Sequence, residues 1–259
     1  MEPLPISVTM IACNEAHNLP RSLGSVAGWV REIIVVINDC TDLTAEVALS
    51  LGARVEERPW TCRRDQKNVA LSLATQPWIL ALDADEEVSA ELRKDIFLFF
   101  QEDHLHWDGA EFPRRTWFLN RWILHGDWYP DYSLRLFRKD RGTWGGSSEH
   151  DRVLLDGRIK RLRGDLLHYS FPTVTANLSK IVTFAEAFGR EKLQEGKQWS
   201  LAETLFRTFW RFFRSYILRL GFLDGYPGFY IAWMTAVATL VRYSKLYELQ
   251  RARAPEKTE

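Results

Sequence analysis

Apolar runs alternate with segments of helical periodicity over the first 83 residues. The runs are short, rich in Ile and Val and little interrupted by polar residues, as in "EIIVVI", which is typical of strands buried on both faces of a sheet. The strand-like runs are residues 6–12, 32–37, 53–59 and 77–83, and the helical segments are residues 18–30, 38–52 and 63–75. This order predicts an α/β fold with a mostly parallel sheet flanked by helices.

The pattern changes after the fourth predicted strand. Ser89 is a suitable N-cap for a helix over residues 90–101. Residues 109–170 then alternate strand-like runs with Gly, Pro and Trp turns, and the rest of the chain is almost entirely helical in pattern. We therefore expect a catalytic domain over residues 1–172 and a helical C-terminal extension over residues 173–259.

Charge and cysteine content narrow the function classes. The chain has 34 basic and 34 acidic residues, so no overall basic field favours nucleic acid, and we expect no nucleic-acid partner. Cys13, Cys40 and Cys62 form no Cys-x-x-Cys pair, which argues against a disulfide framework or a zinc site and indicates a reducing compartment. The N-terminal segment has no basic region before its short apolar run, so we expect no signal peptide and a cytoplasmic location.

An acidic cluster follows the fourth predicted strand in "ILALDADEEV", where Asp83, Asp85, Glu86 and Glu87 lie close together. Polar residues also follow the first two predicted strands, and the carboxyl ends of parallel strands are where such sheets bind ligands. Converging carboxylates repel one another unless a cation binds between them, and Mg²⁺ or Mn²⁺ bound to a diphosphate would provide it. The alternative is a solvated acidic loop that complements the next helix N-terminus.

The ordered set of motifs resembles family 2 glycosyltransferases of the GT-A fold, with a likeness to the branch of bacterial lipopolysaccharide core glucosyltransferases. The segments that carry the resemblance are "VTMIACNEAHNLPRSLGSVAGWVREIIVVINDCTDLTAEVALSLGARV", "QKNVALSLATQPWILALDADEEVSAEL", "WYPDYSLRLFRK" and "LRGDLLHYSF". The resemblance implies a GT-A nucleotide-diphospho-sugar transferase fold and an inverting hexosyltransferase. It also implies a nucleotide-diphosphate sugar donor, with a UDP-sugar favoured, and a divalent cation, Mg²⁺ or Mn²⁺.

The resemblance also implies a nucleotide-sugar pocket. Its residues would be Asn14, Glu15, Asn38, Asp39, Lys67, Asn68 and Asp83. Asp39 would hold the base or ribose, but "NDCTD" is shorter than the "DSGSTD" usual in the branch, so Asn38 or Asp42 are alternatives. Two interpretations of Lys67 stay open, a contact with the phosphates and a solvated helix position.

Metal and catalytic residues follow from the same resemblance. Asp85 and Asp83 match the metal motif, with Asp85 as the direct ligand, and His168 is either a further ligand or a core histidine. A general base is expected on the acceptor side. Asp151 is the first choice because the branch usually has His-Glu where this chain has His-Asp, and Glu149 and Asp131 are alternatives.

Acceptor binding is expected near "HGDWYPDYSLRLF". Trp128 and Tyr129 are suited to stack on a sugar, although aromatic core packing is the alternative, and Arg135 is the third candidate. For the region around Asp151, the alternative to catalysis is a glycine-rich surface turn.

The C-terminal helical pattern indicates a membrane surface. Between residues 200 and 245 there are six basic residues and two acidic ones, and aromatic residues recur at helical spacing. Basic, aromatic-rich amphipathic helices bind anionic lipid headgroups. The charge-free run over residues 225–241 is short for a membrane span, so we expect peripheral attachment to the inner face of the cytoplasmic membrane and a lipid-linked or saccharide acceptor. The alternative is that these helices pack on the catalytic domain or on a second subunit.

Two rival functions stay open from the sequence. One is a phosphotransferase whose strand ends in Asp-x-Asp, although such folds open with that motif, whereas here three strand and helix units precede it. The other is a catalytically inactive, membrane-bound sugar-nucleotide scaffold.

Overall fold

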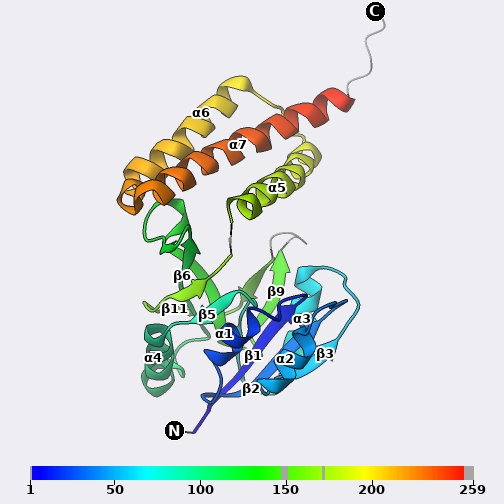
Figure 1. Cartoon of the computed structure of the whole chain (residues 1–259), viewed down its shortest axis with the longest axis vertical. Coiled ribbons are helices and arrows are strands. Elements are labelled where there is room, and N and C mark those ends of the chain that lie inside the picture. The colour runs from blue at the N-terminus through cyan, green and yellow to red at the C-terminus, as the bar shows by residue number, and fades with distance from the viewer. Residues whose placement is uncertain (1, 147–150, 171–172, 254–259) are drawn as a thin grey trace, which may run out of the picture. The chain divides into compact units, whose positions relative to one another are not determined.

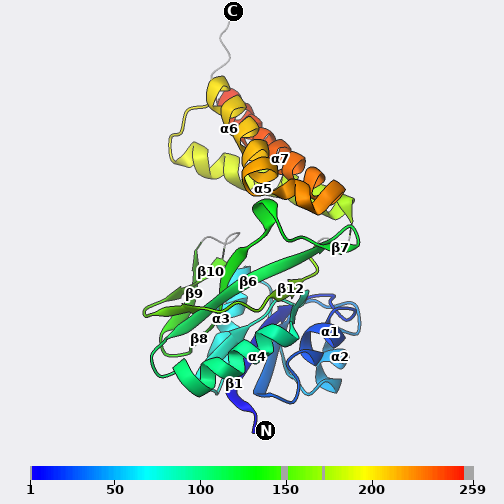
Figure 2. The same cartoon turned by 90° about the vertical axis from the view of Figure 1, so that its left-hand side faces the viewer.

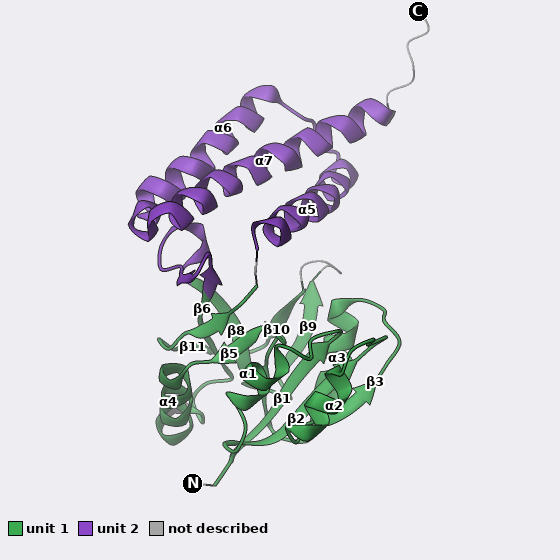
Figure 3. Cartoon of the chain, in the orientation of Figure 1, with its two compact units in different colours: residues 1–115, 131–170 green, residues 116–130, 171–259 purple. Residues whose placement is uncertain are grey.

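The computed structural model describes residues 2–146, 151–170 and 173–253. The chain divides into two compact units, green and purple in Figure 3. Unit 1 contains residues 1–115 and 131–170, and unit 2 contains residues 116–130 and 171–259.

Four parallel strands form one half of the sheet in unit 1, in the order β3-β2-β1-β4. They are β1 (Leu4–Ala12), β2 (Val30–Ile37), β3 (Arg54–Glu57) and β4 (Trp78–Ala81). The helices of this half are α1 (Leu19–Gly24), α2 (Thr44–Ser50), α3 (Arg63–Leu73) and α4 (Ala90–Leu98), which continues into the π-helical turn η1 (Phe99–Asp103). All four predicted strands are confirmed. For β1, β2 and β4 the reason is that strands of a sheet covered on both faces require continuous apolar runs, whereas β3 lies at the end of the sheet and is partly exposed. The first predicted helix, over residues 18–30, is shorter than expected.

The other half of the sheet is mixed. Its strands are β5 (Glu86–Val88), β6 (Gly109–Phe118), β8 (Asp131–Arg138), β11 (Ile159–Arg161) and β12 (Leu166–His168). β8 is antiparallel to β4, and β6 is antiparallel to β8. β9 (Gly142–Gly146) and β10 (Asp151–Leu155) form a separate antiparallel pair. The predicted base, Asp151, is the first residue of β10.

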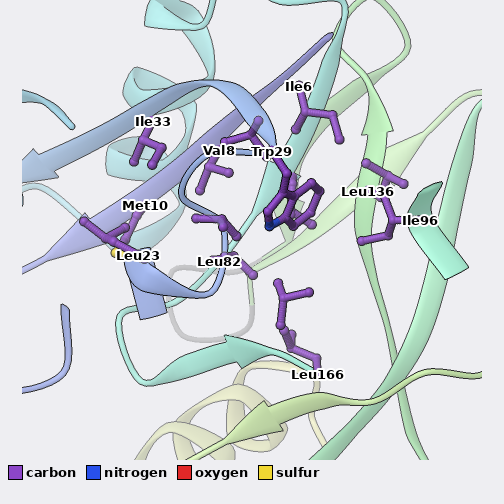
Figure 4. Close-up of a cluster of buried hydrophobic side chains, with 14 of the residues drawn as sticks. Ile6, Val8, Met10, Leu23, Trp29, Ile33, Leu82, Ile96, Leu136 and Leu166 are labelled. Atoms are coloured by element: carbon purple, nitrogen blue, oxygen red, sulfur yellow. The ribbon is translucent and has the colours of Figure 1, made fainter. Parts of the chain in front are cut away.

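Apolar side chains cover both faces of the parallel strands. Residues of α1, α2 and α4 pack with Ile6, Val8 and Met10 on one face, and Figure 4 shows part of this cluster. On the other face, α3 packs with Ile34 and Ile79, together with residues of β9 and β10. Figure 2 shows α3, β9 and β10 apart from α1 and α2. This alternation follows from the strand period of two, which sends successive side chains to opposite faces.

Unit 2 is built on three helices, with α7 in contact with both of the others (Figure 1). The helices are α5 (Val174–Gln194), α6 (Leu201–Phe213) and α7 (Gly225–Arg253), with shorter turns η2 (Gly126–Trp128), η3 (Arg214–Leu218) and η4 (Gly221–Asp224). Within the described residues, no helix is long and apolar enough to cross a bilayer.

Residues 116–130 group with these helices, whereas the sequence-based division placed them in the first domain. The physical reason is a small core in which Phe118 and Ile123 pack with Ile231 of α7. The hairpin of β7 (Arg121–Trp122) with the end of β6 carries Ile123. The long separation between Ile123 and Ile231 hides this contact from sequence patterns.

Candidate active site

The carboxyl ends of β1, β2 and β4 lie at one edge of the sheet, because the three strands are parallel and in register. Asn14 and Asp39 follow β1 and β2 with positive φ angles of 56° and 43°, which Asn and Asp tolerate better than most residues. The Asn14 side-chain oxygen accepts a hydrogen bond from the Thr41 backbone N–H at 2.8 Å. The backbone N–H of Glu15 donates to Thr44 Oγ1 at 2.8 Å, so the loops after β1 and β2 are bonded together.

Among the predicted nucleotide-binding residues, Asp39 is the one whose carboxylate is exposed and makes no side-chain hydrogen bond to the described residues. Asp42, the alternative, accepts hydrogen bonds from the backbone of Ala16 and Thr44 and from the Thr44 hydroxyl. These bonds hold the pKa of Asp42 below its ordinary value. Asp42 therefore holds the loop, and Asp39 is the better placed of the two to bind a ligand. Asn38 lies half-buried beside it.

The acidic cluster after β4 is a closed turn. The backbone N–H of Asp83 donates to the carboxylate of Glu86 at 2.9 Å, and the N–H of Glu86 donates to the Asp83 carbonyl at 3.0 Å. Glu86 has no exposed surface, so the solvated-loop alternative does not describe it. Glu87 accepts a hydrogen bond from the Tyr169 hydroxyl at 3.0 Å. The acidic residue that complements the N-terminus of α4 is Glu91, in the first turn of that helix.

Lys67 lies between two of the predicted site carboxylates. Its Nζ is 2.9 Å from Asp83 Oδ1 and 2.8 Å from Asp151 Oδ2, and it lies 4.3 Å from the centre of the Trp144 ring. The residue is 8% exposed, which excludes the solvated helix position. A buried ammonium needs such paired carboxylates, because desolvation of an unpaired charge is costly.

Arg135 joins Asp83 to Glu86. Its NH2 atom is 2.7 Å from an oxygen of each carboxylate, and the residue is 4% exposed. Burial alone would raise the pKa of the Asp83 carboxyl, but Arg135 and Lys67 overcome this effect and hold the pKa well below its ordinary value. For Arg135, burial acts against the charged form, and Asp83 and Glu86 outweigh it and raise the pKa of the guanidinium.

Arg114 extends the network to Asp131. Its Nε donates to Asp131 Oδ2 at 2.9 Å, and its NH1 is 3.5 Å from Glu86. The connected side chains are Asp151, Lys67, Asp83, Arg135, Glu86, Arg114 and Asp131. Four carboxylates and three cations from α3 through β10 thus form one chain of ion pairs, which contains both described candidates for the base.

Asp85 and His168 come together on the other side of the turn. His168 Nε2 is 3.5 Å from Asp85 Oδ2, and the backbone N–H of Tyr169 donates to the Asp85 carbonyl at 2.9 Å. Among the described residues, no group of three or more His, Cys, Asp or Glu side chains is arranged to hold a metal ion. Asp85 and His168 therefore form a pair of one carboxylate and one imidazole rather than a group of that kind.

Two predicted residues, Asn68 and Trp128, have structural contacts of their own. The side chain of Asn68 bonds both to the backbone N–H and to the carbonyl of Trp144, each at 3.0 Å, and so fixes β9 beside α3. Trp128 belongs to unit 2, where its ring packs edge-on against Phe118 at 5.4 Å. Tyr129 is half-buried in the segment that follows Trp128. Glu149 lies outside the described residues.

Comparison with known proteins decides the family. Residues 7–157, more than half of the chain, match the model of glycosyl transferase family 2. The chain belongs to glycosyl transferase family 2. This membership removes the phosphotransferase alternative and confirms the predicted family.

Relatives of this family 2 protein extend over nearly its whole length. A protein of Rickettsia felis named as an uncharacterized glycosyltransferase is 30% identical over 263 residues, which cover 94% of this chain and 89% of the relative. The lipopolysaccharide core biosynthesis glycosyltransferase LpsC of Rhizobium meliloti is 25% identical over 260 residues, covering 97% and 95% of the two chains.

Solved structures confirm the GT-A fold. The crystal structure of S. aureus TarS 1–349 in complex with UDP-GlcNAc matches with a TM-score of 0.50 and 14% identity, covering 97% of this chain and 93% of that one. Mannosyl-3-phosphoglycerate synthase from Rubrobacter xylanophilus matches with a TM-score of 0.50 and 15% identity over 76% of each chain.

Sequence reasoning missed Glu86, Arg114 and Trp144 as parts of this family 2 site. Glu86 was considered only as a helix-terminus charge, although its place inside the acidic cluster was a usable signal. Arg114 and Trp144 carried no local signal, because their partners Glu86 and Lys67 are 28 and 77 residues away along the chain.

Proposed function

We propose that this family 2 protein is an inverting hexosyltransferase that uses a nucleotide-diphosphate sugar, with a UDP-sugar favoured. The acceptor is a saccharide or lipid-linked molecule of the lipopolysaccharide-core kind, and the similarity to the lipopolysaccharide core biosynthesis glycosyltransferase LpsC supports this choice. The observation that carries the proposal is the pair of contacts from one buried ammonium, Lys67, to Asp83 and Asp151. They join the carboxylate proposed for the donor side to the carboxylate proposed as base.

The residues present fit a divalent cation. Asp85 and His168 offer an oxygen and a nitrogen ligand 3.5 Å apart, and Asp83 lies two residues from Asp85 on the same turn. Mg²⁺ and Mn²⁺ bound with substrate phosphates need few protein ligands, and an imidazole also suits Mn²⁺. When bound, such an ion neutralises charge that develops on the departing diphosphate.

In the proposed reaction, the acceptor hydroxyl oxygen bonds to the anomeric carbon while the bond from that carbon to the diphosphate oxygen breaks. Asp151 takes the hydroxyl proton, on the face opposite the leaving group, so the configuration inverts. Lys67 donates to Asp151 Oδ2, which orients the carboxylate and leaves its other oxygen to accept the proton. Asp131 is the weaker candidate because it accepts two charge-assisted hydrogen bonds from Arg114, whereas Asp151 has a single contact with Lys67 among the described residues, and such bonds to the charged form make a carboxylate less basic.

Donor binding in this proposal uses the edge of the parallel strands. Asp39 holds the base or ribose, with Asn14, Glu15 and Asn38 around it, and Asp83 lies on the ribose side. We further propose that residues 1–172 carry catalysis. Residues 173–259 would then attach the enzyme to the inner face of the cytoplasmic membrane.

The test begins with thermal unfolding of the full chain in the presence of UDP-, GDP- and ADP-sugars, each with Mg²⁺, Mn²⁺ or a chelator. We expect one donor to raise the midpoint only with the cation, because a ligand bound by the native state alone stabilises it. Asp85→Ala should remove this cation dependence. No stabilisation by any donor in either cation would contradict the proposal.

Catalysis is tested with Asp151→Asn and its matched control Asp131→Asn. Loss of a general base lowers kcat by roughly 10²–10⁴-fold, so Asp151→Asn should lose transfer to this extent while it keeps donor binding. Asp131→Asn should keep most of the activity. The opposite ranking would assign the base to Asp131, and a wild-type protein that binds donor but transfers to no acceptor would favour the scaffold alternative.

A further inference from the structure

Helix α6 of unit 2 exposes much of its apolar face. Phe206 and Phe209 are 68% and 71% exposed. The structure describes every residue of α6, and its one buried side chain is that of Thr204. The hydroxyls of Thr204 and Thr208 donate to carbonyls four residues earlier in the same helix, at 2.7 and 2.8 Å. A surface helix of a soluble domain normally buries its apolar stripe and exposes its polar one, so α6 is oriented the opposite way.

The exposed apolar surface continues onto the neighbouring segments of unit 2. The Phe212 ring lies 5.5 Å from that of Trp233, and the Tyr216 ring lies 5.8 Å from that of Phe229. We call the whole surface the aromatic face. Its members, each at least 42% exposed, are Leu205, Phe206, Phe209, Trp210, Phe213, Ile217, Phe222, Leu223, Tyr226, Phe229 and Trp233. An apolar surface this continuous on a folded protein marks an interaction site.

A cluster of arginines comes from the same helical hairpin. Arg211, Arg214 and Arg219 all approach Asp127, at 3.4, 2.6 and 3.4 Å, and this carboxylate side chain is 8% exposed. Three guanidinium groups around one carboxylate give this cluster a net charge of plus two. Arg242 adds a further positive charge near Arg211. The pKa of its guanidinium is lowered, mainly by burial and in smaller part by repulsion from Arg211.

The chemistry of this surface selects its occupant. Trp, Tyr and Phe rings beside arginines match the boundary between acyl chains and phosphate headgroups. A second copy of the chain would present its own arginines, and the nearby carboxylates Asp127, Glu203 and Asp224 are already paired within unit 2. Like charges would then face each other across such an interface.

We propose that the aromatic face inserts into the headgroup region of an anionic membrane leaflet, with α6 in the membrane plane, and that lipid phosphates bind at Arg211, Arg214 and Arg219. The proposal rests on the membrane location in the proposed function and assigns it to named side chains. The outward side chains reach the acyl boundary while the inward Thr204 face stays on α7.

The experiment is co-sedimentation of the full chain with vesicles of phosphatidylcholine, with or without about one third phosphatidylglycerol. Phe209→Ser with Phe213→Ser should weaken binding to the anionic vesicles by at least ~10-fold, since each ring loses part of its transfer free energy. Val182→Ser is the matched control, because Val182 is a 68% exposed apolar side chain of α5 outside the aromatic face. It should bind as the wild type does.

The arginine cluster is tested with Arg211→Gln and Arg219→Gln together, which leave Arg214 paired with Asp127 at 2.6 Å. At ~1 kcal/mol for each arginine near an anionic surface, binding to the anionic vesicles should fall by roughly 30-fold. Binding to vesicles of phosphatidylcholine alone should change little. Equal loss with both vesicle types would show that the arginines do not select an anionic surface, and would remove this part of the proposal.

Two results would overturn the whole proposal. One is equal vesicle binding by the wild type and the double phenylalanine variant. The other is a dimer of the wild type in sedimentation velocity that the same variant dissolves, without vesicle binding, which would make the face an interface between copies. Donor binding is measured on the same samples, so that failure of the membrane proposal can be told from failure of the transferase proposal. A protein that binds vesicles but no sugar nucleotide would support the membrane proposal and contradict the transferase proposal.

Discussion

Helix α1 in unit 1 and helix α6 in unit 2 treat their apolar residues in opposite ways. α1 buries Leu19 and Leu23 completely against the sheet, whereas α6 exposes Phe206 and Phe209 and buries Thr204. Glu86 and Arg135 form a buried ion pair in unit 1, and the pair of Glu186 and Lys245 is a more exposed counterpart in unit 2. Helix α1 of unit 1 thus packs its apolar side chains inside the core, whereas α6 of unit 2 exposes the apolar surface for which we propose a membrane.

The contrast predicts that the same substitution has very different effects in the two units. Phe137 of β8 is fully buried, and Phe209 of α6 is 71% exposed. Phe137→Ala should lower the free energy of unfolding by about 3–5 kcal/mol, because it removes transfer free energy and leaves a cavity. Phe209→Ala should change it by less than about 0.5 kcal/mol. Urea denaturation followed by circular dichroism measures both.

A comparable loss from Phe209→Ala would mean that the Phe209 ring is buried in the folded protein. The contrast between the two units would then not hold at α6, and the proposal that the aromatic face is exposed would be wrong. Leu105→Ala is a control for an exposed apolar side chain of unit 1, since Leu105 is 79% exposed.

Acid should weaken unit 1 through Asp83 more than it weakens unit 2 through Glu186. The pKa of Asp83 is held below its ordinary value, so the carboxylate stabilises the folded state above the unfolded pKa of about 3.9, and this stability is lost as the pH falls from there towards the folded pKa. Asp83→Asn should flatten the dependence of the unfolding free energy on pH by at most about 1.4 kcal/mol per pH unit in that range.

The matched variant in unit 2 is Glu186→Gln. Hydrogen bonds from Lys245 and Arg190 lower the pKa of Glu186, but solvent screens these exposed contacts. Its pH profile should overlay that of the wild type in moderate salt. If Asp83→Asn left the profile unchanged, the pairing of Asp83 with Arg135 and Lys67 would not contribute to stability.

The contrast also explains how far the sequence could predict the structure. β1, β2 and β4 were predicted because strands buried on both faces must be apolar throughout. β5 was missed because it begins with Glu86 and Glu87, and a buried Glu86 is tolerated only with Arg114 and Arg135 from strands β6 and β8. Such long-range pairs have no local signature.

Helical periodicity likewise gives the amphipathic character of α6 but not the direction of its apolar face. That direction depends on what α7 offers for packing. In the site, the positions of Asp83 and Asp85 followed from their place after a strand, whereas the role of Lys67 depended on Asp151, which is 84 residues away. The sequence could therefore propose the members of the site but not the bonds between them.

The smallest expected difference concerns the serine caps of one helix in each unit. The hydroxyl oxygen of Ser89 accepts a hydrogen bond from the Leu92 N–H at 3.0 Å, and that of Ser200 accepts one from the Glu203 N–H at 3.4 Å. Ser89→Ala should cost about 1 kcal/mol of unfolding free energy, a usual value for an N-cap. Ser200→Ala should cost only a few tenths of a kcal/mol, because the longer bond contributes less.

The threonine variants at both positions are the controls, since a threonine cap keeps the hydroxyl acceptor and should restore most of the stability. Ser89 is also 5% exposed, so the alanine variant leaves the Leu92 N–H buried without a partner. Water can replace the lost bond more easily at the partly buried cap of α6. Equal costs at the two caps would show that solvent reaches both helix starts alike, and the difference in burial between the units would then not extend to their helix ends.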